Sequence, residues 1–208
     1  MEVLEVWGLS NDNDIERCCL TVYHSVGQRT RVYFDNMKTF CQLYLGVLNP
    51  DILIDGVKFD AWIPAPTALA ELGNNTTTRI WGLFDLLALG CRAYLRVGRD
   101  DDAAELAKLA ISPDQHTLKK SELMSCHSIL GEVAAKRKQL EEADGHFANA
   151  LEMAKQSGLP MLEVVTAREW KKHLLEPNGR DVSVAEAVID GACLKMKKSR
   201  MEVASVVL

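Results

Sequence analysis

The sequence predicts an all-α fold in which antiparallel helix pairs stack on one another. Two observations support this fold class. Apolar residues recur at three- and four-residue spacing over most of the chain, and a set of small residues recurs after a long, nearly constant interval. The clearest single unit lies between residues 123 and 160, and the other predicted elements extend it.

The sequence of residues 123–160 predicts two helices joined by a tight turn. Apolar residues at helical spacing continue to Ala134, and the polar run 136–139 then interrupts them. Gly158 and Pro160 mark the end of the second helix. Small or apolar residues share one face of that second helix, where small side chains allow close packing: Ala143, Phe147, Ala150, Leu151 and Ala154.

The same pattern of small and apolar residues occurs three times. Its starting residues are Ala103, Ala143 and Ala185, so the period is 40 residues (143 − 103) and then 42 residues (185 − 143). The corresponding positions in the three sets are Ala103, Ala107, Ala110 and Ile111; Ala143, Phe147, Ala150 and Leu151; and Ala185, Ile189, Ala192 and Cys193. Such a period predicts a repeat protein, in which each helix pair buries its apolar face against the next.

Residues of the middle unit resemble the tetratricopeptide repeat family. Leu130-Gly131 in the first helix and Ala143, Phe147 and Ala150 in the second match the family's small and aromatic positions. The family's period is about 34 residues, so these units resemble a divergent variant with long repeats. The resemblance implies a short right-handed α-solenoid over residues 76–208, preceded by a helical extension or degenerate repeat over residues 1–75.

The sequence of the N-terminal part predicts several shorter secondary-structure elements. Residues 1–14 are expected to form a strand or an irregular segment, and residues 15–26 and 29–47 are expected to be helices. Between residues 51 and 59, Asp55-Gly56 indicates either a β-hairpin or an extended loop. Prolines then interrupt regular structure before a short helix over residues 67–72 and a long apolar helix over residues 80–95. Asp100, Asp101 and Asp102 are typical of a helix start.

Composition excludes several classes of protein. The net charge of −5 is spread along the chain, which argues against nucleic-acid binding. The longest apolar run, residues 80–89, contains Asp85 and is too short to span a membrane, and the first residues lack the pattern of a secretory signal. The six cysteines have neither zinc-site spacing nor the density of a disulfide scaffold. They predict reduced thiols and therefore a cytoplasmic or other reducing compartment.

Catalytic motifs are not evident in the sequence. It contains no P-loop, no glycine-rich dinucleotide turn and no Gly-x-Ser-x-Gly elbow. Cys126 and His127 are adjacent, so on a helix they point about 100° apart and cannot pair by themselves. The histidines have no metal-ligand spacing, and His127 is expected to contact another helix. We therefore predict a protein that is not an enzyme and that needs no cofactor or metal.

The resemblance implies a concave groove lined by the first helix of each pair. Residues of that groove would bind a protein or peptide partner, and basic side chains outnumber acidic ones there, which favours an acidic or carboxylate-terminated segment. The predicted partner-binding residues are Arg92, Arg96, Ser128, Glu132, Lys136, Arg168 and Lys172. Ordinary solvated surface charges remain the alternative for these residues. The alternative function is a structural or assembly subunit that uses apolar helix faces and the tail 203–208.

Overall fold

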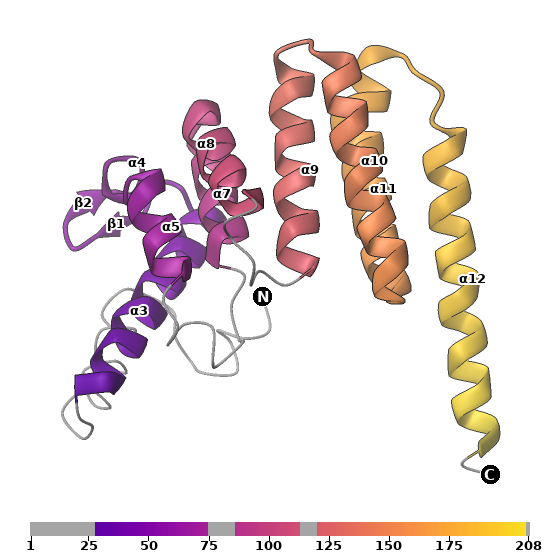
Figure 1. The fold of residues 1–208 in the computed structure, drawn as a ribbon, viewed down its shortest axis with the longest axis horizontal. Coiled ribbons are helices and arrows are strands. Elements are labelled where there is room, and N and C mark those ends of the chain that lie inside the picture. The colour runs from indigo at the N-terminus through magenta and orange to yellow at the C-terminus, as the bar shows by residue number, and fades with distance from the viewer. Residues whose placement is uncertain (1–27, 75–85, 113–119, 207–208) are drawn as a thin grey trace. The chain divides into compact units, whose positions relative to one another are not determined.

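A computed structural model describes residues 28–74, 86–112 and 120–206 of the chain. These residues are mostly helical and include one small two-stranded sheet, which confirms the all-α class (Figure 1). The strand and helix expected within residues 1–26 lie outside the described residues. The chain divides into two compact units, residues 1–106 and 107–208, and each is described by itself below. The predicted boundary at residues 75 and 76 lies at the edge of an undescribed segment and stays a prediction.

In its described residues, the first unit has a short hairpin that follows one helix along the chain and precedes the others. Its elements are α3 (Gln28–Leu48), β1 (Leu53–Ile54), β2 (Val57–Lys58), α4 (Phe59–Trp62), α5 (Pro66–Asn74), α7 (Leu86–Arg96) and α8 (Asp100–Ile111), the last of which continues past the unit boundary. The helix expected at residues 29–47 is therefore confirmed as α3, and the short helix expected at 67–72 as α5.

The β-hairpin settles the alternative that the sequence left open at residues 51–59. Ile54 pairs with Val57, so the connecting turn has two residues, Asp55 and Gly56. Both have positive φ angles, 51° and 78°, as a type I′ turn requires. Asp-Gly is suited to that turn because Gly has no Cβ and Asp tolerates the left-handed conformation.

Helix α7 is the centre of the first unit and contacts both α3 and α5. Gly90 permits this packing, because a Cβ atom at that position would lie 2.9 Å from Leu69 Cδ1 and 3.0 Å from Leu106 Cδ2. The side chain that fills this space from α8 is thus Leu106. Ala107, which occupies the aromatic position in the predicted repeat, is buried as well.

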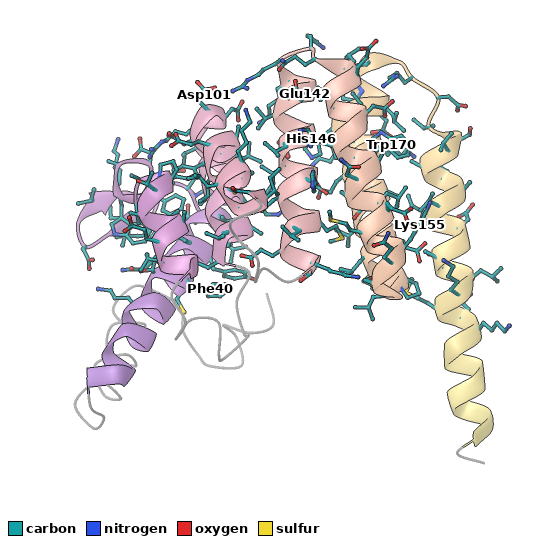
Figure 2. The ribbon with its side chains drawn as sticks, viewed as in Figure 1. Phe40, Asp101, Glu142, His146, Lys155 and Trp170 are labelled. Atoms are coloured by element: carbon teal, nitrogen blue, oxygen red, sulfur yellow. The ribbon has the colours of Figure 1, made fainter. Side chains whose placement is uncertain are left out.

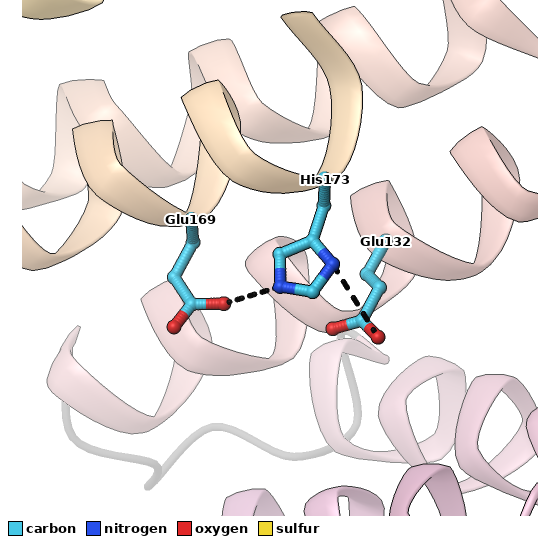
Figure 3. Close-up of side chains that lie close together, drawn as sticks. All are labelled: Glu132, Glu169 and His173. Carbon is cyan, nitrogen blue, oxygen red and sulfur yellow. Dashed lines mark ion pairs between the residues drawn. The ribbon is translucent and has the colours of Figure 1, made fainter. Parts of the chain in front are cut away.

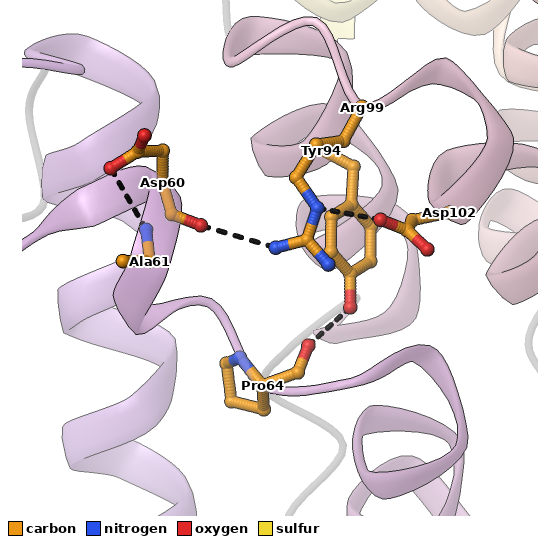
Figure 4. A network of polar contacts seen from close by, with 6 residues as sticks. All are labelled: Asp60, Ala61, Pro64, Tyr94, Arg99 and Asp102. Carbon is orange, nitrogen blue, oxygen red and sulfur yellow. Dashed lines mark hydrogen bonds and ion pairs between the residues drawn. The ribbon is translucent and has the colours of Figure 1, made fainter.

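Tyr94 and Arg99 join the end of α7 to the loop after α4 (Figure 4). The Tyr94 hydroxyl donates to the Pro64 carbonyl oxygen, and the Arg99 guanidinium lies 4.8 Å from the centre of the Tyr94 ring. Arg99 Nη1 donates to the Asp60 carbonyl oxygen at 3.1 Å, and its Nε donates to Asp102 Oδ2. Burial raises the pKa of Tyr94, so the phenol remains a donor to Pro64. These contacts connect the end of α7 to the segment 60–64, so we interpret the network as one that stabilises the fold.

Over residues 120–206, the second unit consists of four successive helices that run antiparallel to their neighbours (Figure 1). Helix α9 packs on α10, α10 on α11, and α11 on α12, and α11 also contacts α9. After α11 the helix continues through a π-helical turn and a short 3₁₀ segment before α12 begins. The bounds are α9 (Lys120–Lys136), α10 (Leu140–Ser157), α11 (Pro160–Trp170), η1 (Lys171–Leu175), η2 (Glu176–Asn178) and α12 (Ser183–Val206).

Phe147 of α10 lies at the centre of the packing between α9 and α10. It is fully buried, and a Cβ atom at Gly131 would lie 2.8 Å from two carbons of its ring. Glycine on α9 therefore lets the aromatic ring approach the helix backbone. The surrounding core is made of small and aliphatic side chains from several helices: Ala134, Ala135, Ala143, Leu174, Leu175 and Ala185.

Three turns between helices have the same backbone hydrogen bonds. In each, a residue with positive φ follows the helix: Gly98 (77°), Lys138 (62°) and Gly179 (62°). The backbone N–H of the next residue donates a hydrogen bond to the carbonyl oxygen five residues back. The N···O distance is 2.9 Å in all three cases: Arg99 to Tyr94, Gln139 to Ala134 and Arg180 to Leu175. This is the hydrogen bond of a Schellman cap, which closes a helix with a left-handed residue. The three turns recur after 40 (138 − 98) and 41 (179 − 138) residues.

Lys138 is the exception among these turns, because a residue with a Cβ atom occupies a left-handed position there. We expect Lys138→Gly to raise the free energy of unfolding by about 1 kcal/mol, since glycine removes the steric cost of positive φ. Gly98→Ala, the matched change at the corresponding turn, should lower the free energy by a similar amount. Urea unfolding followed by circular dichroism measures both changes, and a destabilised Lys138→Gly protein would contradict the prediction.

Candidate functional site

Glu132, Glu169 and His173 form a compact cluster in the second unit (Figure 3). The His173 ring lies between the two carboxylates. Its Nε2 is 3.2 Å from Glu169 Oε2, and its Nδ1 is 3.6 Å from Glu132 Oε1. One nitrogen or oxygen atom from each residue lies within 4.8 Å of the other two.

Two helices supply these side chains. Glu169 and His173 are four residues apart, so they lie on one side of α11 and its continuation η1. Glu132 comes from α9, which contacts both α11 and η1. The three side chains are 13%, 24% and 19% exposed for Glu132, Glu169 and His173, so packing restricts them while water still reaches them. His173 lies within the π-helical turn Lys171–Leu175, a distortion that is frequent at functional sites.

An ion pair on α9 adjoins the cluster. Lys136 Nζ lies 3.3 Å from Glu132 Oε1, and the Lys136 side chain is 41% exposed. Carboxylate oxygens together with an imidazole nitrogen make a ligand set suited to a divalent cation.

The structure places the predicted partner-binding residues in different environments. Glu132 and Lys136 form an ion pair on α9, and Ser128 is buried on the same helix. Arg168 and Lys172 are exposed, and each lies one residue before a member of the cluster, Glu169 and His173 respectively. On α7 of the first unit, Arg92 is partly buried and Arg96 is exposed.

Sequence reasoning missed Glu169 and His173. Their four-residue spacing on a predicted helix was a signal that they share a side, but such a pair is common on helices. The third member, Glu132, is distant in sequence. Its proximity depends on the packing of α11 against α9.

His127 and His146 form a second pair of titratable side chains, between α9 and α10. Their Nδ1 atoms are 3.1 Å apart, so His127 contacts another helix, as we expected. Figure 2 labels His146, the member of the pair on α10. Burial lowers the pKa of His127, and His146 lowers it further. Burial also lowers the pKa of His146; Glu142 acts against this shift and Lys108 adds to it. A lowered pKa favours the neutral form of each ring, and in that form the N–H of one ring can donate to the lone pair of the other.

Comparison with protein-family models, with curated proteins and with solved structures finds no match. The function proposed for this chain therefore rests on its own residues. Within the described part of the chain, no helix combines the length and the apolar character needed to cross a bilayer.

Proposed function

We propose that this protein is a non-catalytic interaction module that binds an acidic peptide segment along α11. The observation that carries the proposal is a stripe of exposed side chains on that helix. Met161, Val165, Arg168 and Lys172 follow one another at intervals of four, three and four residues, so they share one side of α11 and η1.

The stripe combines apolar and basic character. Met161 and Val165 are 57% and 40% exposed, and the preceding Leu159 is exposed as well. Exposed apolar residues that gather on one helix face are typical of a binding surface. Arg168 and Lys172 continue the stripe and provide two positive charges on a chain of net charge −5. The complementary ligand is a segment with apolar side chains followed by carboxylates.

The arrangement of helix pairs supports the same proposal. Helix α11 is the first helix of a pair, and in tetratricopeptide proteins the first helices line the concave groove. The three identical turns and the packing of α11 against both α9 and α10 are those expected of a short right-handed solenoid of this type. Cys41, Cys91 and Cys126 are buried thiols, which supports the proposal that the protein resides in the cytoplasm or another reducing compartment.

Assembly into a larger complex is less well supported. Helix α12 exposes Val184 and Leu194, but these residues lie ten positions apart, and scattered surface apolar residues are ordinary. Residues 203–206 of the predicted assembly tail continue α12, and residues 207–208 lie outside the described residues. Among the side chains described on α12, these two therefore form no continuous apolar surface that favours assembly over peptide binding.

A peptide-display selection tests the proposal. The full chain is used to select from a random peptide library, and the affinity of an enriched peptide is then measured by fluorescence anisotropy. We expect enrichment of acidic sequences, with binding that weakens as salt is added. Arg168→Glu combined with Lys172→Glu should weaken binding of the selected peptide at least tenfold.

The matched control reverses two other exposed lysines of the same unit, Lys155→Glu and Lys197→Glu, which changes the net charge equally. This control should leave affinity nearly unchanged. The proposal fails if no acidic peptide is enriched, or if both double variants weaken binding to the same extent.

A further inference from the structure

We propose that Glu132 and His173, with Glu169 as the positioning carboxylate, bind a divalent transition metal ion of the zinc type. The proposal concerns the cluster between α9 and α11–η1. It does not depend on peptide binding along the exposed side of α11.

The two distances to the His173 ring have different meanings. The 3.2 Å between Nε2 and Glu169 Oε2 is within the range of an N–H···O hydrogen bond. The 3.6 Å between Nδ1 and Glu132 Oε1 is too long for one. Two ligands that bind one tetrahedral zinc ion at about 2.1 Å lie about 3.4 Å apart, so this second distance suits a pair of metal ligands.

Both ring nitrogens of His173 face a carboxylate, Nε2 toward Glu169 and Nδ1 toward Glu132. A metal ion bound to Nδ1 and Glu132 would leave Nε2 to carry the N–H that donates to Glu169. Metal-binding histidines usually donate their second ring N–H to a carboxylate, and Glu169 supplies that acceptor here.

The surroundings of the cluster favour an ion site that water can reach. All three side chains are partly buried but still reached by solvent, so water can complete the coordination. Lys136 is the competing cation, because its ammonium contacts the same Glu132 oxygen. It is the more exposed partner of that pair and can move away when an ion binds. Imidazole and carboxylate together select zinc and its neighbours over magnesium, for which oxygen ligands alone are preferred.

Binding of zinc ions to the full chain tests the inference. The protein is freed of metal by a chelator and titrated with Zn²⁺ against a chromophoric indicator, and Co²⁺ is used as a spectroscopic substitute. We expect one ion per chain at this site. His173→Gln and Glu132→Gln should each weaken Zn²⁺ binding at least tenfold. Glu169→Gln, whose amide oxygen still accepts the ring N–H, should weaken it less.

Two further variants separate a metal site from an ion-pair network. Lys136→Met removes the competing ammonium and should tighten Zn²⁺ binding several-fold. His146→Gln removes a histidine from the other histidine pair of this unit and should leave Zn²⁺ affinity unchanged. Circular dichroism verifies that each variant is folded.

The inference is overturned if the wild-type chain shows no saturable Zn²⁺ binding. It is also overturned if His173→Gln binds Zn²⁺ as tightly as wild type. Loss of binding in His146→Gln with retention in His173→Gln would assign the ion to His127 and His146 instead.

Discussion

Phe147→Ala is expected to lower the free energy of unfolding by about 3–5 kcal/mol. The ring is fully buried between α9 and α10, and it lies directly over Gly131. The substitution removes most of the side chain from a place that small neighbours cannot refill. Ala134, Ala143 and Ala150 are already too short to reach across the space. The loss therefore includes both the transfer free energy of the ring and the cost of a cavity.

Urea denaturation followed by circular dichroism measures this loss. Met161→Ala is the control, because Met161 is exposed on α11 and its truncation should change the free energy of unfolding by no more than about 0.5 kcal/mol. If Phe147→Ala costs less than about 1 kcal/mol, the packing of α10 against α9 is not the main core of this unit.

Lys195→Met is expected to lower the free energy of unfolding by about 1–3 kcal/mol. Lys195 Nζ lies 2.8 Å and 3.0 Å from the two carboxylate oxygens of Glu163. The Glu163 side chain is only 6% exposed, whereas the Lys195 side chain is 58% exposed. Removing the lysine leaves a buried carboxylate without this partner, and the desolvation cost of that group dominates the change.

Lys198→Met is the matched control for this charge, because Lys198 is exposed three residues further along α12. It should have little effect on the free energy of unfolding. A double variant with Glu163→Gln and Lys195→Met should recover part of the loss, since the buried group is then uncharged. Equal effects of Lys195→Met and Lys198→Met would show that the Glu163 contact contributes little.

The sequence by itself determined the class of fold and most helix positions. Apolar spacing located α3, α9 and α10 to within a few residues, and Asp55-Gly56 identified the hairpin as one of two alternatives. The polar run 136–139 indicated the turn that carries Lys138. These features depend on residues close together in the chain, where helical spacing and turn geometry decide the outcome.

Tertiary structure alone decided the composition of the candidate site. Glu132 was predicted from the sequence to line a groove with Arg168 and Lys172, whereas the side chain that faces it across the helices is that of His173, which also lies next to Glu169. Consecutive helical residues point about 100° apart, so a shift of one residue changes which side chains meet the neighbouring helix. Spacing within one helix shows which residues share a side. The rotation of α11 against α9 is set by long-range packing, and that packing determines which side the cluster occupies.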